Sequence, residues 1–239
     1  MIINCESIYK MYLGAKFLGT GTTAHAFFKD EKVLKVYRNT KRSRYVFNEF
    51  NDMVEHLLEL SEIKVEKVST PVDIYIQNNI VKAISLEFVD GITLKEKIPD
   101  VNIDIFFNYL KEFEEMAYKL SEKRVWVKDF HSGNVIINEN GINVIDTDEY
   151  YITGFDKYTC LEHNLNTLFH NLFYGIFLFE RGFYFESEYL NALLEKYLNI
   201  YGTYEDDLKL YYAICNEIGN DKSLVEINKL IKTLGRVKK

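Results

Sequence analysis

Two different hydrophobic periodicities divide this chain, and they constrain its fold more than any other feature of the sequence. Up to Asp90, most apolar positions come in short runs rich in aromatic and β-branched side chains, which is typical of strands. From Gly91 onward, apolar positions recur mainly with the helical period in long segments. The sequence therefore predicts an α+β protein with a sheet-rich part at residues 1–90 and a mainly helical part at residues 91–239.

The expected elements follow from these patterns. Three antiparallel strands are predicted over Phe17 to Tyr37, with Gly19 to Ala24 as the first turn. Two more strands are predicted on either side of Asn78-Asn79, and one helix at about Tyr45 to Leu60. The second part is expected to hold a strand-rich stretch at residues 125–151. Helices are expected there at 103–120, at 164–179 and at three places between 188 and 234.

Charge and cysteine content exclude several classes of protein. The chain of 239 residues has a net charge of −7, which argues against nucleic acid as a partner because the phosphate backbone is bound by a basic surface. The longest apolar run, Leu172 to Phe179, is too short to span a bilayer, which takes about 20 residues. Cys5, Cys160 and Cys215 are odd in number and far apart, and the start lacks a secretion signal. We therefore expect a cytoplasmic protein with no membrane partner.

Polar side chains interrupt two apolar strands near the middle of the chain. In VWVKDFHSGNVIIN, Asp129 and Asn134 lie five positions apart, directly before the apolar Val135 to Ile137. In GINVIDTDEY, the apolar Val144-Ile145 ends at Asp146. A carboxylate beside a buried strand is costly unless it is paired or bound to a metal. These positions are therefore candidates for a site that uses charge.

The two segments resemble the protein-kinase superfamily, especially the bacterial branch that includes aminoglycoside phosphotransferases and related small kinases. The family's catalytic loop is HRDxxxxN in protein kinases and HGDxHPGN in the phosphotransferases, and VKDFHSGN keeps the Asp, the later Asn and the His-x-Gly-Asn ending. IDTD is similar to the IDxD that the phosphotransferases favour over DFG. The resemblance covers nearly the whole chain and implies a bilobal fold. The small lobe, residues 1–90, would hold an antiparallel sheet plus one helix, and the larger lobe, residues 91–239, would be mainly helical.

The implied nucleotide contacts begin in the first part of the chain. Gly19 and Gly21 fit the glycine-rich loop, whose backbone N–H groups fold over phosphates. Lys35 fits the strand lysine that neutralises the α- and β-phosphates of ATP, and Glu49 fits the helix glutamate that holds this lysine. Glu55 on the same helix is the alternative partner. The plainer alternatives are a glycine-bearing hairpin without a ligand and a lysine at the surface.

The other implied contacts involve adenine, the metal and the phosphoryl acceptor. Glu87 and Val89 fit the hinge segment that offers backbone groups to adenine. Asn134 and Asp146 are oxygen ligands of the kind that Mg²⁺ prefers. Asp129 fits the aspartate that accepts or orients the proton of the attacking hydroxyl, and a helix-loop cap is its plainer alternative.

Several positions depart from the family pattern. Ala24 replaces the last loop glycine, Val127 replaces the HRD histidine, and Lys128 replaces the arginine. Asp148 stands where DFG has glycine, and no APE sequence follows. These departures argue against a conventional regulated protein kinase, whereas the intact metal and phosphate ligands argue against a dead pseudokinase.

The histidines and the charged stretches have structural alternatives as well. His131 is expected to bond its own loop backbone, and His163 and His170 are expected to pack against neighbours, since no third metal ligand is in view. The basic stretch Lys35 to Arg44 is either a solvated loop that leads into a helix or a docking patch for an acidic substrate or for phosphate. The acid-rich stretch Glu188 to Tyr212 is either a solvated helix face or a pocket wall for a cationic substrate.

The leading hypothesis is an ATP- and Mg²⁺-dependent phosphotransferase that transfers the γ-phosphate to a hydroxyl of a protein (Ser/Thr) or a small molecule. The alternative is a catalytically weak, kinase-like scaffold that binds nucleotide and acts through a protein partner. A dinucleotide-binding dehydrogenase would need a helix directly after Ala24, where the pattern predicts a strand.

Overall fold

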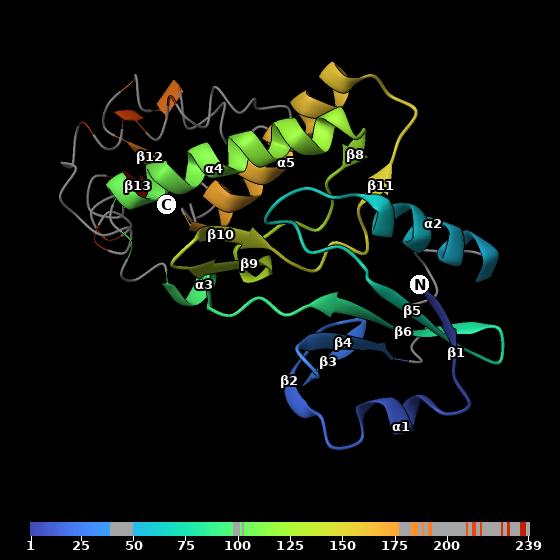
Figure 1. Cartoon of the computed structure of the whole chain (residues 1–239). Coiled ribbons are helices and arrows are strands. Elements are labelled where there is room, and N and C mark those ends of the chain that lie inside the picture. The colour runs from blue at the N-terminus through green and yellow to red at the C-terminus, as the bar shows by residue number, and fades with distance from the viewer. Residues whose placement is uncertain are drawn as a thin grey trace. The chain divides into compact units, whose positions relative to one another are not determined.

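The chain forms two compact units of mixed helix and strand, so the protein is α+β, as the computed structural model shows (Figure 1). The first unit comprises Met1–Asp90 and Asn143–Thr153, and the second comprises Gly91–Ile142 and Gly154–Lys239. The structure describes residues 1–38, 50–97, 101, 103–176, 183–185, 188, 191–192, 209, 212–213, 216, 226, 229 and 235–237. Among these residues, no helix is both long and apolar enough to cross a membrane.

A six-stranded sheet forms the framework of the first unit. Its spatial order is β1-β5-β6-β4-β3-β2, with bounds β1 (Ile2–Asn4), β2 (Lys16–Thr20), β3 (Ala24–Lys29), β4 (Lys32–Tyr37), β5 (Asp73–Gln77) and β6 (Ile80–Glu87). Strands β2 to β4 are consecutive antiparallel neighbours, which confirms the three strands predicted there. Asn78 and Asn79 join β5 to β6 with φ of 53° and 55°. This short hairpin turn requires positive φ at both residues, and asparagine tolerates positive φ better than most side chains do.

Apolar side chains pack on both faces of this sheet. On one face, Leu57 from α2 (Phe50–Glu62) packs with Ile84 and the other buried residues of its cluster. On the other face, residues of α1 (Ile8–Tyr12) pack against Leu34 and Ala83. Alternate residues of β4 therefore belong to different layers, and this alternation decides which side chains of the strand meet α2.

The prediction of an antiparallel sheet with one helix is wrong at the N-terminus. Strand β1 pairs parallel to β5, so the sheet is mixed, and α1 is a second helix within the first ninety residues. Both elements are too short for a periodic pattern, because β1 has 3 residues and α1 has 5. Backbone pairing such as Cys5 N–H to the Ile76 carbonyl, at 2.8 Å, holds this segment in place.

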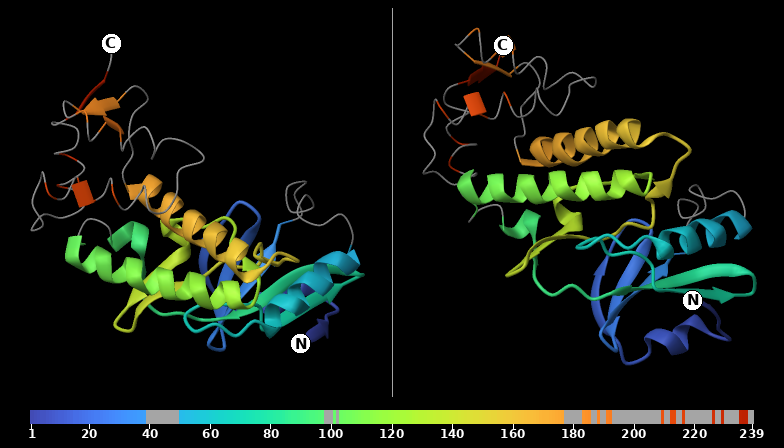
Figure 2. Two further views of the ribbon diagram at one scale, coloured as in Figure 1. Left: turned by 90° about the horizontal axis from the view of Figure 1, so that it is seen from above. Right: turned by 45° about the horizontal axis from the view of Figure 1, so that its top comes forward.

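Two long helices dominate the described part of the second unit. Helices α4 (Ile103–Glu122) and α5 (Lys157–Ile176) lie side by side (Figure 2). The shorter elements of this unit are β7 (Ile92–Thr93), α3 (Leu94–Lys97), β8 (Val125–Trp126), the 3₁₀ helix η3 (Ser132–Asn134), β9 (Val135–Asn138), β12 (Phe183–Phe185) and β13 (Gly235–Val237). Strand β10 (Gly141–Val144) begins in the second unit and ends in the first, and β11 (Tyr151–Ile152) belongs to the first.

The helix at 103–120 and the strand-rich stretch are confirmed, but α5 begins seven residues earlier than predicted. The Asp156 carboxylate caps its start, accepting hydrogen bonds from Tyr158 N–H at 2.8 Å and Thr159 N–H at 3.1 Å. An aspartate at this position satisfies backbone donors that the first helical turn leaves free. The three helices expected between 188 and 234, and the last residues expected for α5, lie almost entirely outside the described residues.

Candidate functional site

Lys35 lies on β4, on the face of the sheet that meets α2. Its neighbours Leu34 and Val36 belong to the layer beneath α1, whereas Val33 and Tyr37 pack with the cluster around α2. Because strand side chains alternate, Lys35 shares the side of Val33 and Tyr37. Only 13% of the Lys35 side chain is exposed, so its ammonium needs a charged partner within the first unit.

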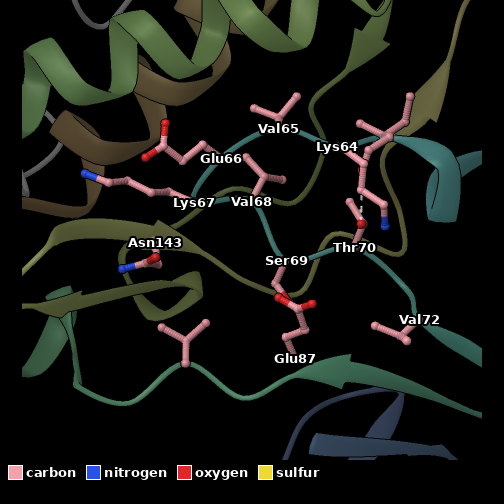
Figure 3. A pocket seen from close by; sticks show the side chains of 12 residues that line it. Lys64, Val65, Glu66, Lys67, Val68, Ser69, Thr70, Val72, Glu87 and Asn143 are labelled. Atoms are coloured by element: carbon pink, nitrogen blue, oxygen red, sulfur yellow. Dashed lines mark hydrogen bonds between the residues drawn. The ribbon is translucent and has the colours of Figure 1, made fainter.

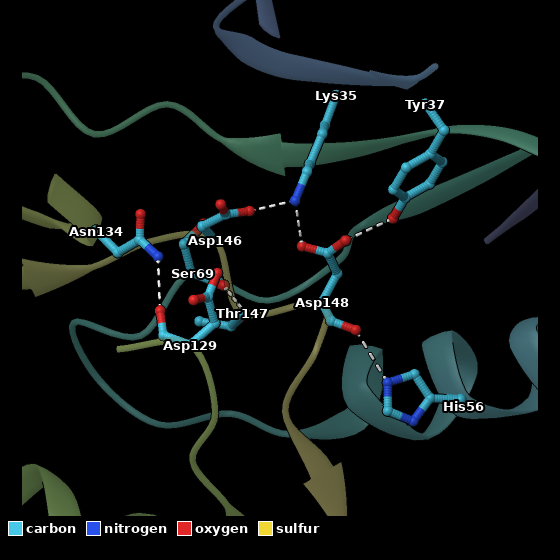
Figure 4. A network of polar contacts seen from close by, with 9 residues as sticks. All are labelled: Lys35, Tyr37, His56, Ser69, Asp129, Asn134, Asp146, Thr147 and Asp148. Atoms are coloured by element: carbon cyan, nitrogen blue, oxygen red, sulfur yellow. Dashed lines mark hydrogen bonds and ion pairs between the residues drawn. The ribbon is translucent and has the colours of Figure 1, made fainter. Parts of the chain in front are cut away.

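Two carboxylates supply that partnership. The Lys35 ammonium donates to Asp146 Oδ1 and, at 2.6 Å, to Asp148 Oδ1 (Figure 4). Lys35 is 111 residues from Asp146 along the chain, yet both belong to the first unit because the segment 143–153 returns to it. Burial alone would lower the pKa of Lys35, but the charges of Asp148 and Asp146 outweigh it and raise the pKa above its ordinary value. The lysine is therefore held as a cation.

Asp148 is the more deeply buried of the two carboxylates. Its side chain is 8% exposed, and its second oxygen accepts a hydrogen bond of 2.7 Å from the Tyr37 hydroxyl. The Asp148 carbonyl oxygen lies 3.0 Å from Nε2 of His56 on α2 (Figure 4). Burial alone would raise the pKa of Asp148, but the charge and hydrogen bond of Lys35 and the hydrogen bond of Tyr37 bring it below its usual value. Asp148 is thus a fixed anion.

Tyr37 stays neutral beside this anion. Burial raises the pKa of its phenol well above the ordinary value, and the charge of Asp148 raises it further. The hydroxyl therefore keeps the proton that it donates to Asp148. Neither Tyr37 nor Asp148 was assigned a role from the sequence, although the two-residue spacing from Lys35 to Tyr37 along β4 and the second Asp of IDTD pointed to both.

Asp146 differs from Asp148 in exposure and in the direction of its pKa shift. Its side chain is 39% exposed, and its backbone is left-handed with φ of 62°. Burial and the charge of Asp148 together outweigh the attraction of Lys35 and raise the pKa of Asp146. Backbone strain of this kind clusters at functional sites, and an accessible carboxylate can bind a cation more readily than a sequestered one.

The sequence resemblance implied that a helix glutamate, Glu49, holds Lys35. Glu49 lies outside the described residues. Glu55, the alternative, is exposed on α2. Within the described ranges, the ion pairs of Lys35 are with Asp146 and Asp148 alone. Among the described residues, Lys35 is therefore anchored by carboxylates of the segment that follows β10.

The predicted glycine loop is the turn between β2 and β3. Gly19 lies in β2, opposite Ala26, and Gly21 opens the turn. The Gly21 N–H donates to the Ala24 carbonyl at 2.9 Å, so this amide already has a partner within the turn. The Gly21 carbonyl lies 3.5 Å from a guanidinium nitrogen of Arg38. Arg38 is also the last described residue of the basic stretch, whose remainder to Arg44 lies outside the described residues.

Asp129 and Asn134 lie together in the second unit. The Asn134 carboxamide donates to the Asp129 carbonyl at 2.9 Å (Figure 4), and Asn134 itself is 7% exposed. The Asp129 backbone is left-handed with φ of 46°, and its side chain is exposed. His131 caps η3 by accepting from the Gly133 N–H at 3.1 Å, which confirms its predicted structural role. The loop thus presents one free carboxylate and one fixed amide.

Asn164 anchors this loop from α5, and the sequence did not predict it. The side chain is fully buried; its oxygen accepts from the Val127 N–H at 2.9 Å, and its nitrogen donates to the Val125 carbonyl at 2.8 Å. His163 Nε2 lies 3.0 Å from the Val127 carbonyl, so this histidine packs against the loop. Phe130 packs edge-on against Phe113 of α4, with ring centres 5.3 Å apart. A polar residue within an apolar helical stretch was the available signal for Asn164.

The predicted hinge residues lie at the end of β6. Glu87 is the last residue of that strand, and Val89 follows it by two positions. The side chains of both line a pocket of the first unit.

The donor chemistry fits a magnesium ion bound together with phosphate. Mg²⁺ prefers oxygen ligands and usually keeps waters and phosphate oxygens beside one or two carboxylates. In the first unit, Asp146 offers an accessible carboxylate. In the second unit, considered by itself, Asn134 offers an amide oxygen because its nitrogen is already engaged. In the part of the chain that the structure describes, no three His, Cys, Asp or Glu side chains form a metal cage, and a site of this type does not require one.

No protein-family model matches the chain, and no curated protein matches it in sequence.

Proposed function

We propose that the protein is an ATP- and Mg²⁺-dependent phosphotransferase of bilobal, protein-kinase-like fold that transfers the γ-phosphate to a hydroxyl group. The acceptor is a small molecule or a protein serine or threonine, and the reaction takes place in the cytoplasm. The single observation that carries this proposal is the convergence of Lys35 with Asp146 and Asp148. The sequence resemblance implies that Lys35 and Asp146 meet, and these two residues are 111 positions apart along the chain.

Phosphoryl transfer suits this set of groups because the protein has little covalent chemistry to perform. Catalysis depends on positioning the phosphates and neutralising their charge. The role of Lys35 is to bind phosphate oxygens, and that of Asp146, with Asn134, is to hold Mg²⁺. Bound Mg²⁺ would neutralise charge that develops on the transferred phosphate. Asp129 orients the acceptor hydroxyl and receives its proton, a role that suits an exposed carboxylate on a fixed loop.

Asp148 is the positioning residue of this site. In the family that the sequence resembles, a helix glutamate holds the strand lysine. Here the contact at 2.6 Å, the burial of Asp148 and the support from Tyr37 give Asp148 the same task. The departure of IDTD from DFG is then a change of anchor, because the second aspartate replaces a residue that has no side chain.

The test is phosphate transfer from γ-labelled ATP in the presence of Mg²⁺. We expect ATP turnover in the wild type, a loss of at least about a hundredfold in Asp129→Asn, and a comparable loss in Lys35→Met. Glu59→Gln on the exposed face of α2 is the matched control and should retain wild-type turnover. ATP binding without turnover or transfer under any condition would reject the enzyme and favour the nucleotide-binding scaffold.

Asp148→Asn separates positioning from chemistry. If Asp148 only holds Lys35, the variant should raise KM for ATP more than it lowers kcat, and Asp148→Glu should restore part of the loss. A fall in kcat alone, without change in KM, would contradict the positioning role.

The acceptor is sought by following the label. Incubation with a panel of aminoglycosides and other hydroxylated metabolites, and separately with a cell extract, distinguishes a small-molecule acceptor from a protein. Label in neither fraction, alongside ATP hydrolysis by the wild type, would reject both acceptor classes tested.

A further inference from the structure

A pocket within the first unit lies apart from the residues assigned above to phosphate and metal (Figure 3). Of the residues assigned a role above, it shares only Glu87 and Val89, whose backbone groups were given to adenine. Its volume is about 350 Å³, and neither Lys35 nor Asp146 lines it. The lining comes from one continuous segment, from the end of β6 and from β10, namely Ile63 to Thr70, Val72, Glu87, Val89 and Asn143. Small-molecule sites commonly measure roughly 300–1,000 Å³, so this volume suits a compact ligand.

The walls are held by backbone pairing to β10. The Val144 N–H donates to the Lys67 carbonyl at 2.8 Å, and the Ser69 N–H donates to the Val144 carbonyl at 2.9 Å. Val68 and Val144 form an isolated parallel bridge, and the Thr70 hydroxyl donates to the Ile63 carbonyl at 3.2 Å. Because the wall is tied at several points, the pocket is pre-formed, which lowers the cost of ordering it around a ligand.

The lining favours an uncharged ligand with an apolar body. Its apolar side chains are Ile63, Val65, Val68, Val72 and Val89. Its charged side chains, two lysines and two glutamates, balance to no net charge. A charged ligand would lose its hydration without gaining a compensating excess of opposite charge.

Asn143 gives the pocket a polar requirement. Its side chain projects from β10 into the lining (Figure 3). Its Nδ2 is buried and has no hydrogen-bond partner. Among the described residues, every other buried side-chain nitrogen or oxygen has one. A buried donor without a partner is unfavourable, because it has lost its hydrogen bonds to water and gained none in return. An acceptor that enters the pocket satisfies this donor, directly or after a half-turn of the carboxamide that exchanges its nitrogen and oxygen.

We propose that this pocket is a second ligand site, for a small, uncharged and largely apolar molecule whose carbonyl oxygen accepts a hydrogen bond from Asn143. The site also touches the segment that carries the carboxylates of the first. The Thr147 hydroxyl, between Asp146 and Asp148 in sequence, donates to the carbonyl of the lining residue Ser69. The binding does not depend on the proposed phosphotransfer.

Benzophenone is a suitable probe, because it is uncharged and apolar, carries one carbonyl, and cross-links to nearby C–H bonds under near-ultraviolet light. Its hydrocarbon analogue, in which a methylene group replaces the carbonyl oxygen, is the matched control ligand. We expect saturable binding of benzophenone to the whole chain, with cross-links within residues 63–72 and slower amide exchange at 143–148. The hydrocarbon should bind roughly tenfold more weakly, the equivalent of one hydrogen bond.

Two variants assign the contact. Asn143→Leu should remove the preference for the carbonyl while leaving hydrocarbon binding intact, and Val72→Phe should reduce the binding of both ligands by narrowing the pocket. Ile80→Phe, at an exposed position of β6, is the control and should change neither. Equal binding of the two ligands to the wild type, or cross-links concentrated on β4 instead of 63–72, would overturn the proposal. All these measurements are made without ATP, so they stand whether or not the protein transfers phosphate.

Discussion

Replacing Asp148 by asparagine should destabilise the protein far more than the same change at Asp146. Asp148 is 8% exposed and accepts hydrogen bonds from Lys35 at 2.6 Å and Tyr37 at 2.7 Å. Breaking a buried pair by removing one partner costs about 3–5 kcal/mol, and the contact that Lys35 keeps with Asp146 offsets part of that. We expect a loss of about 2–4 kcal/mol for Asp148→Asn.

Asp146→Asn is the matched variant, since it removes the other carboxylate from the same lysine. Its side chain is 39% exposed, so water screens and replaces the interaction, and we expect a loss of only about 0–1 kcal/mol. In activity the order should reverse, because Asp146 is the proposed metal ligand. A variant of near-native stability that lacks Mg²⁺-dependent turnover separates the two roles.

Urea unfolding followed by circular dichroism, and amide exchange over β4, measure these losses. The exchange experiment reports the first unit directly, which matters because two units can unfold in separate steps. A double-mutant cycle with Lys35→Met should give a coupling of about 1–3 kcal/mol with Asp148→Asn and less with Asp146→Asn. The reasoning is refuted if Asp146→Asn costs as much as Asp148→Asn, or if the Lys35 and Asp148 losses simply add.

Three further predictions follow from single contacts. Tyr37→Phe removes the hydroxyl that donates to Asp148 and should lower the free energy of unfolding by about 1.5–3 kcal/mol in thermal and urea melts; an unchanged melt would show that the bond contributes nothing. Gly91→Ala places a Cβ 2.4 Å from a backbone carbonyl of β9 at φ of 143° and should destabilise by more than about 1 kcal/mol, whereas Gly154→Ala, with no atom within 4 Å of its Cβ, should melt like the wild type. Burial lowers the pKa of His163 below 6.5, so the folded protein binds this proton less readily than the unfolded chain does. The free energy of unfolding should therefore rise with pH up to about 6.5 and level off above it, and the rise should shrink in His163→Gln; equal slopes would contradict the shift.

The sheet could be predicted from the sequence wherever its strands were long enough to show alternation. Strands β2 to β6 and the Asn78-Asn79 turn were predicted because side-chain period and turn chemistry agree at those positions. Strand β1 and helix α1 could not be predicted, because each is held by backbone pairing or packing against distant residues rather than by its own pattern. The start of α5 was placed too late because the cap at Asp156 was not recognised.

The sequence indicated the outline of the candidate site but not the contact between Lys35 and Asp148. The sequence resemblance implied that Lys35 and Asp146 meet, and the structure places them in contact. The sequence singled out Asp148 only because it stands where the DFG motif has glycine. Its role depends on Tyr37 and on burial, which are properties of the folded unit and not of the motif. The Asn164 network is of the same kind, since its three partners come from the end of α4 and from the chain that follows it.

The charges of Lys35, Asp146 and Asp148 can be compared directly, because one ammonium contacts two carboxylates. The single positive charge of the Lys35 ammonium faces two carboxylates, and their pKa values shift in opposite directions: burial and the charge of Asp148 raise the pKa of Asp146, whereas Lys35 and Tyr37 lower that of Asp148. Asp146 is the more exposed of the two carboxylates, and one ammonium cannot balance both negative charges. A divalent cation would supply the compensation that Asp146 lacks, while Asp148 and Tyr37 keep the lysine in place. In the proposed phosphotransferase, Asp148 and Tyr37 would therefore hold the lysine that binds phosphate, while Asp146 would be available to bind the metal ion.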